Sequence, residues 1–250
     1  MAYDGTEYAG FQVQPNAPTV QGEIERVLAE ICGGPVRVTG AGRTDAGVHA
    51  TGQVIDFRTA SALDGSTMER GVNALLPEDI AVSGLEPAGE TFHARFSATG
   101  RTYEYRIRNA PTRDPLERRR EQWLPATLDR AAMREASARL VGRHDFAAFA
   151  AGVSGERTVR RAVWSEEGEV LRFEIEADAF LRGMVRGIVG TLLWVGRGKT
   201  SIDRFGVILR GGDRALAGPS APARGLCLVT VSYDGAERVG RESDHEEQDE

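Results

Sequence analysis

The 250-residue sequence predicts an α+β fold in which two halves, each with the same order of elements, join into one mixed, largely antiparallel sheet. Two observations support this class. Segments with the period of a strand and segments with the period of a helix follow one another as β-α-β-β-α-β, and the same order then recurs. Glycine, proline and capping residues separate these segments where turns are expected.

The first half begins with a short strand over residues 1–3 and a helix over 20–31, for which Thr19 is the predicted N-cap. Strands over 36–39 and 53–58 flank a glycine-rich loop. The run Ser66-Thr-Met-Glu69 reads as a capping box that opens a short helix ended by Pro77, and a strand over 80–85 follows.

The second half repeats this order with little residue identity to the first. Its predicted elements are a strand over 102–107, a helix over 128–141, strands over 157–164 and 170–177, a helix over 181–195, an extra helix from 201 to 211, and a strand over 226–233. Glu167-Gly168 marks a hairpin turn between the two central strands.

Each half is therefore expected to be a split-βαβ unit, ferredoxin-like and similar to RNA-recognition modules, with both helices on one face of its sheet. Joined edge to edge, the two units would form one broad sheet with a central cleft at the seam. The predicted domains are residues 1–97, which carry the glycine-rich loop, and residues 98–235, followed by an acidic disordered tail over 236–250.

Charge is distributed unevenly along the chain. Residues 236–250 hold seven acidic residues and two arginines, and so account for most of the net charge of −6. Residues 101–120 instead hold seven arginines against three acidic residues, which is compatible either with a nucleic-acid face or with an ordinary solvated surface. No apolar run approaches a membrane span, no leader is evident, and two isolated cysteines fit a reducing cytoplasm.

The loop Gly40-Ala-Gly-Arg-Thr-Asp-Ala-Gly-Val-His-Ala50 places Asp45 at its centre, two residues after Arg43. An ionisable side chain on a loop between rigid strands is a common arrangement for a reactive group. The loop alone equally fits an Asx-turn at Asp45 beside a solvated Arg43.

Two further candidates lie in the second half. Arg186 falls at the edge of the apolar arc of helix 181–195, where it could present its charge at the seam or pair within its own half. Tyr103 lies on an arginine-rich strand, where its ring could stack on a base or simply fill the core, as Tyr105 and Ile107 on the same face suggest.

Several other motifs fail. The run from Gly40 has Asp45 at the position where a dinucleotide-binding motif has its third glycine. The run that ends in Gly198-Lys-Thr has Leu193 at the position where a phosphate-binding loop has its first glycine. The four histidines have no metal-ligand spacing, and the motifs of a zinc-dependent base deaminase are missing. We therefore expect neither a metal nor a cofactor.

Taken together, the motifs resemble those of the tRNA pseudouridine synthase A family in the family's order, over almost the whole chain to about Tyr233. They are Tyr3-Asp-Gly-Thr, Gly10-Phe-Gln-Val-Gln-Pro-Asn, Thr19-Val-Gln, the Asp45 loop, Gly52-Gln-Val, Phe92-His-Ala-Arg-Phe-Ser-Ala, Arg101-Thr-Tyr-Glu-Tyr, Phe180-Leu-Arg-Gly-Met-Val-Arg-Gly-Ile-Val-Gly and Ala221-Pro-Ala-Arg-Gly-Leu. Two departures are Phe11, where tryptophan is usual, and a looser match over 122–125.

The resemblance implies a homodimer that converts uridines 38 to 40 in the anticodon stem-loop of tRNA to pseudouridine without a cofactor. It implies that Asp45 is the catalytic aspartate, that Arg186 pairs with it across the cleft and that Tyr103 stacks on the target uracil. Arg43 is the loop neighbour and Leu226 lines the pocket. The carboxylate could attack C1′, attack C6 or deprotonate the sugar. The alternative is a non-catalytic RNA-binding protein of two RNA-recognition-like halves, although no RNP1-like aromatic strand is present.

Overall fold

The computed structural model describes residues 1–234. In the first half the elements are β1 (Ala2–Tyr3), α1 (Val20–Cys32), β2 (Val38–Gly40), β3 (His49–Ala50), β4 (Ile55–Phe57), α2 (Gly65–Leu75) and β5 (Ile80–Ala81). In the second half they are β6 (Ala98–Arg108), β7 (Gln122–Trp123), α3 (Arg130–Ala138), β8 (Gly142–Asp145), β9 (Glu156–Glu167), β10 (Val170–Ala177), α4 (Met184–Gly196), α5 (Ile202–Gly211) and β11 (Leu226–Tyr233). Short 3₁₀ turns lie at Ala147–Phe149, Arg214–Leu216 and Ala223–Gly225.

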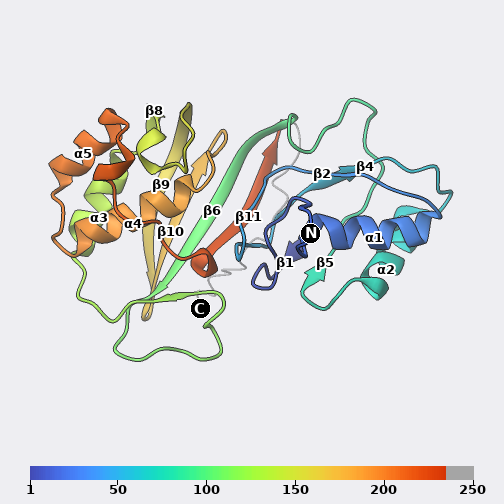
Figure 1. Ribbon diagram of the computed structural model, residues 1–250, viewed down its shortest axis with the longest axis horizontal. Coiled ribbons are helices and arrows are strands. Elements are labelled where there is room, and N and C mark those ends of the chain that lie inside the picture. Colours follow the sequence, from blue (N-terminus) through green and yellow to red (C-terminus); the bar gives the residue numbers. More distant parts are fainter. Residues whose placement is uncertain (235–250) are drawn as a thin grey trace, which may run out of the picture.

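A nine-stranded sheet spans both halves in the order β5-β1-β3-β11-β6-β10-β9-β8, with β7 beside β6. Its pairs are antiparallel except for β3 with β11 and β6 with β7. Figure 1 shows α1 and α2 with the first half and α3, α4 and α5 with the second, on either side of the long strands β6 and β11. The predicted α+β class, with one mixed and largely antiparallel sheet, is confirmed.

The long strands have one apolar and one charged face because side chains alternate along a strand. Tyr105 on β6 and Phe173 on β10 are cross-strand partners and fully buried. The intervening Glu104 and Glu174 are also partners and are only partly buried. The apolar face joins the core that α4 completes, whereas the other face carries a lattice of arginine–glutamate pairs.

The helix ends follow the capping rules, with two corrections to the predicted boundaries. Helix α1 begins as predicted, with the Thr19 hydroxyl accepting from Gly22 N. Helix α2 is capped by Asp64, whose carboxylate accepts from Thr67 N, so it begins before the predicted capping box at Ser66. Helix α4 begins only at Met184, because Gly183 at φ 71° forms a turn that leaves Leu181 outside the helix.

The strands that flank the Asp45 loop also differ from prediction. Strands β2 and β4 pair with each other in a separate two-stranded sheet. The loop instead enters the large sheet through β3, a two-residue strand that no local pattern marks, since it is stabilised by pairing with β1 and β11. The short strands β7 and β8 were likewise not predicted.

The seam between the halves is narrow. Strand β3 pairs with β11 only at His49 with Cys227 and Ala50 with Leu228. Gly52 lies so close to β11 that a Cβ atom there would be 2.1 Å from Val229 O, so the approach requires glycine. The division at residues 97 and 98 stays a prediction, and the predicted tail over 236–250 lies outside the described residues. No helix within residues 1–234 is long and apolar enough to cross a membrane.

Candidate active site

Asp45 lies in the loop between β2 and β3, with its side chain 30% exposed. A turn closes behind it, where Val48 N donates to Asp45 O at 3.1 Å and Gly47 adopts φ 74°. Gly10, at φ 109°, packs its backbone directly against the loop. A Cβ atom at this position would be 2.8 Å from Thr44 O, so the close approach requires glycine. The carboxylate is therefore held on a backbone of defined shape and remains accessible to a substrate.

Buried polar side chains fix both ends of this loop. Gln53 is fully buried and bonds Gly42 twice, donating to its carbonyl oxygen at 2.7 Å and accepting from its N–H at 3.2 Å. The Thr44 and Tyr3 hydroxyl groups lie 2.8 Å apart. Arg101 from β6 donates from Nη2 to Ala41 O at 3.0 Å, which ties the loop to the second half. These contacts give the loop the rigidity that a catalytic group needs.

Arg186 reaches Asp45 from the first turn of α4. Its Nη1 lies 3.3 Å from Asp45 Oδ2, and this ion pair joins residues 141 positions apart. Its Nε donates to Ala221 O at 2.8 Å, and its own carbonyl oxygen accepts from Ala221 N at 2.9 Å. The Arg186 side chain is 25% exposed, so the pair lies at the rim of the seam. The structure thus brings Asp45 and Arg186 together, and excludes a pairing of Arg186 confined to its own half.

Tyr103 lies on β6 with only 7% of its surface exposed, so its ring is buried, as the core interpretation predicted. Phe180 packs edge-on against the ring, with centroids 5.1 Å apart and planes at 84°. The hydroxyl group makes no hydrogen bond with residues 1–234 and is not among their buried unpaired polar atoms, so its oxygen keeps some accessible surface. Burial raises the pKa of Tyr103, and the nearby Asp45 carboxylate adds to the effect. The hydroxyl therefore stays protonated at neutral pH.

The two remaining predicted residues, Arg43 and Leu226, make no hydrogen bond or ion pair with Asp45 or Arg186. Arg43 is exposed and makes no hydrogen bond or ion pair with any other residue of 1–234. Leu226 is buried at the start of β11, opposite Tyr105 on β6. On that strand Leu228 lies opposite Tyr103 and is the nearer neighbour of the Asp45 loop, since a Cβ at Gly42 would meet its Cδ2 at 3.4 Å. Their roles as substrate-binding residues stay predictions.

Sequence analysis predicted no role for three residues that position the Asp45 loop or Arg186. They are Arg101, Gln53 and Ala221. Each acts through contacts between segments distant in sequence, which local periodicity does not report. The sequence does carry one signal for Arg101, because an arginine among the inward-facing positions of a strand requires a polar partner. Among residues 1–234 no group of three or more His, Cys, Asp or Glu side chains could hold a metal ion.

Substituting Gly190 with alanine is expected to lower stability and to displace Arg186. A Cβ at this position of α4 would lie 1.7 Å from Pro219 O, so the segment that holds Arg186 through Ala221 must move. Overpacking of this kind costs about 1–3 kcal/mol, which corresponds to a melting temperature lower by roughly 2–12 °C. Differential scanning calorimetry measures the shift. The matched control is Gly211→Ala at the end of α5, where nothing lies within 4 Å and no loss is expected; equal melting temperatures for both variants would contradict the prediction.

The chain is similar to proteins of one known family. A family model described as tRNA pseudouridine synthase matches residues 1–97 and 136–234. The tRNA pseudouridine synthase A of Syntrophotalea carbinolica is 46% identical over 235 residues, covering 92% of this chain and 93% of the relative. Those of Chloroflexus aurantiacus and Geobacillus kaustophilus are 47% and 45% identical, covering 93% and 94% of this chain and 87% and 93% of the relatives.

Among solved structures, a chain of a Cbf5-Nop10-Gar1 complex aligns over 92% of this chain and 57% of its own length, with 12% identity and a TM-score of 0.35, which is too weak to inform the fold or the site. The match of the family model and the identity to full-length relatives are decisive. The chain belongs to the tRNA pseudouridine synthase A family.

Proposed function

We propose that this protein isomerises uridine to pseudouridine at positions 38, 39 and 40 of the tRNA anticodon stem-loop, with Asp45 as the catalytic nucleophile. Family membership makes the chain an isomerase of the tRNA pseudouridine synthases. The observation that carries the finer proposal is the Asp45–Arg186 ion pair, formed at 3.3 Å by residues from the two halves of the sheet. Because the Asp45 carboxylate lies between the two halves and remains accessible, it is placed to react with a nucleobase that enters from solvent.

The reaction breaks the N1–C1′ bond, turns the uracil and joins C5 to C1′, while one proton leaves C5 and one is gained at N1. It is redox-neutral and is therefore compatible with protein side chains alone. Three routes use a carboxylate. In two of them Asp45 acts as a nucleophile and attacks C1′ of the ribose or C6 of the uracil, and in the third it removes a proton from the sugar. All three need an ionised, reachable carboxylate at this position.

Arg186 would act by holding the Asp45 carboxylate through a charge-assisted hydrogen bond, with its own guanidinium anchored at Ala221 O. Tyr103 would contact the target uracil at the floor of the site. Because its hydroxyl stays protonated, it is better suited to donate a hydrogen bond than to remove the C5 proton. Arg43, exposed on the same loop, is suited to a phosphate of the substrate.

A uridine in the stem must leave the base stack before it reaches Asp45, which costs a few kcal/mol. Contacts between arginine side chains and the RNA backbone would offset this cost. We also propose that the protein acts as a homodimer in the cytoplasm, without metal or cofactor; light scattering of the purified protein tests the oligomeric state.

Mapping pseudouridine in unmodified tRNA treated with the purified protein tests the function. The expected result is conversion at positions 38, 39 and 40 where uridine is present. The competing function, RNA binding without catalysis, predicts that tRNA is bound while its nucleoside composition stays unchanged. That outcome would remove the catalytic proposal.

A further inference from the structure

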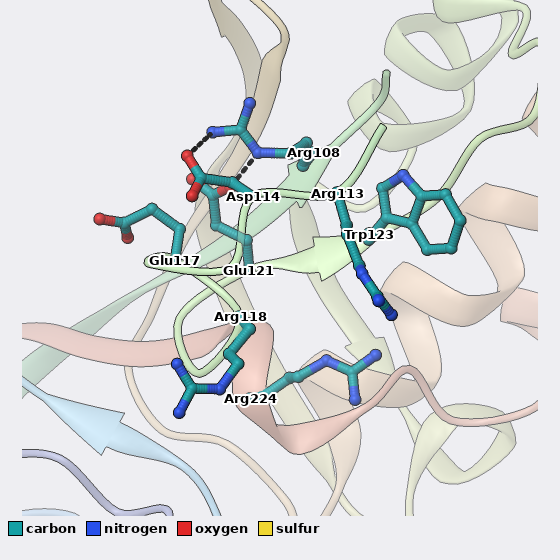
Figure 2. A pocket seen from close by; sticks show the side chains of 8 residues that line it. All are labelled: Arg108, Arg113, Asp114, Glu117, Arg118, Glu121, Trp123 and Arg224. Atoms are coloured by element: carbon teal, nitrogen blue, oxygen red, sulfur yellow. Dashed lines mark hydrogen bonds and ion pairs between the residues drawn. The ribbon is translucent and has the colours of Figure 1, made fainter. Parts of the chain in front are cut away.

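A cavity of about 310 Å³ lies apart from the Asp45–Arg186 pair, between β6, the loop that follows it, β7 and the turn at Ala223–Gly225. The side chains that line it are Arg108, Arg113, Asp114, Glu117, Arg118, Glu121, Trp123 and Arg224 (Figure 2). Most of them come from residues 108–123, which lie between the two segments that the family model matches. We call this the arginine pocket.

Two of the three acidic residues that line the arginine pocket form ion pairs with one arginine, Arg108. Arg108 bonds Glu121 at 3.0 Å and Asp114 at 3.3 Å, and Glu121 also accepts from Arg106 at 2.9 Å. Figure 2 shows Arg108 with its partners at one end of the pocket, with Glu117 pointing away. These contacts engage Glu121 and Asp114, so Glu117 is the one lining carboxylate without an arginine partner among residues 1–234.

Three arginines of the pocket have no acidic partner within residues 1–234. Within the described residues, the side chains of Arg113 and Arg224 make no hydrogen bond or ion pair, and Arg118 donates only to Pro115 O at 2.9 Å. Glu117 also forms no ion pair with another residue of 1–234, so these four side chains, three arginines and one glutamate, carry a net charge of +2. Guanidinium groups gathered around one cavity repel one another unless an anion lies between them, and their planar donors fit phosphate oxygens.

An aromatic surface adjoins these charges. Trp123 is 39% exposed, and its Nε1 donates to Ala110 O at 3.0 Å, which fixes the orientation of the indole. In Figure 2 the guanidinium groups of Arg113 and Arg224 extend to the same side of the pocket as the indole. An exposed, oriented indole beside unpaired arginines is the combination that binds a base together with its phosphate.

His49 connects this pocket to the catalytic loop. Its Nδ1 accepts from Gly5 N at 3.1 Å, so its Nε2 is the donor to Arg119 O at 2.8 Å and Arg224 O at 3.2 Å. The two segments that carry the pocket arginines are thus fastened to the residue four positions after Asp45. The pocket therefore lies in a fixed position relative to the candidate nucleophile.

We infer that the arginine pocket binds an RNA phosphate of the substrate, with the adjoining base on Trp123, at a nucleotide other than the target uridine. This inference rests on the proposed function for the identity of the RNA. An anion held by Arg113, Arg118 and Arg224 while the target uridine lies at Asp45 gives the enzyme a second point of attachment, which orients the stem-loop.

The test compares the double variant Arg113→Ala/Arg224→Ala with Arg210→Ala, which removes an exposed arginine of α5 outside the pocket. The side chains of Arg113 and Arg224 have no hydrogen-bond or ion-pair partners among residues 1–234, so the urea unfolding midpoint should match that of the wild type. The double variant is expected to bind tRNA about tenfold more weakly, to lower the magnitude of the log–log salt slope by about 2, and to keep kcat within about twofold. The control should change none of these.

Binding and salt slope equal to those of Arg210→Ala would overturn the inference, as would binding of inorganic phosphate by the pocket with unchanged tRNA affinity. A second measurement follows the base: quenching of tryptophan fluorescence by tRNA should fall in Trp123→Phe, and unchanged quenching would refute stacking on Trp123. Failure of the proposed function is distinguishable, because it would show as absent pseudouridine formation by the wild type, whereas these variants are judged on binding.

Discussion

Asp45→Asn is expected to lower pseudouridine formation on the order of 10⁴-fold or more, the scale seen when a catalytic group of this kind is removed. Asparagine has nearly the same shape, but it lacks the charge and the nucleophilic oxygen. Its amide oxygen can still accept from Arg186 Nη1, and the loop remains held by Gln53 and Arg101. Folding and tRNA affinity should therefore survive, with the dissociation constant within about threefold.

Tritium release from tRNA that contains 5-tritiated uridine measures this effect, and filter binding measures affinity in the same preparations. Asp203→Asn on α5 is the control, because that carboxylate is 92% exposed and its one ion pair within the described residues is with Arg139. Undiminished release by Asp45→Asn would refute its role as nucleophile. Loss of release together with loss of tRNA binding would instead indicate that the carboxylate supports the loop.

Arg101→Met is expected to cost at least about 1–3 kcal/mol of folding free energy, because buried carbonyl oxygens lose their donor. Arg101 is 8% exposed, and its guanidinium donates to the carbonyl oxygens of Ala41, Arg95, Ala98 and Asp178 at distances from 2.6 to 3.3 Å. Methionine fills the volume but leaves all four oxygens without this donor. Burial already lowers the pKa of Arg101, which shows how far the group has been removed from water.

Urea unfolding followed by circular dichroism measures the loss, and hydrogen exchange of residues 41–48 should rise because Ala41 O is freed. The control is Arg161→Met on β9, since Arg161 is 57% exposed and its one ion pair among residues 1–234 is with Glu174 at 2.7 Å. An exposed pair of that kind contributes about 0–1 kcal/mol. If both variants lost the same stability, Arg101 would not be the connection between the halves described above.

Much of the second half was predictable because its elements are long and periodic. Strand β11 and strand β10 have the predicted bounds, and α5 spans Ile202–Gly211 where a helix from 201 to 211 was predicted. The pairing of Asp45 with Arg186 was available only through resemblance to a family, since helical spacing placed Arg186 at an edge without naming its partner.

What could not be predicted depends on contacts between distant segments. Strand β3 has two residues and exists because β1 and β11 lie beside it. The start of α4 depends on the left-handed conformation of Gly183. A glycine before an apolar run can adopt many conformations, so the sequence does not predict this one. The His49 contacts to Arg119 and Arg224 span 70 and 175 positions, and local patterns carry no information over such separations.

The position of β11 has a consequence for how the enzyme matures. It is the last strand of the described chain, yet it is inserted between β3 and β6 near the middle of the sheet. During synthesis the Asp45 loop leaves the ribosome long before Ala221 and β11 do, and pairings of such high contact order form late. A nascent chain therefore exposes Asp45 before the residue that anchors Arg186 and the neighbouring strand β11 have been synthesised, so the Asp45–Arg186 pair can be completed only after them.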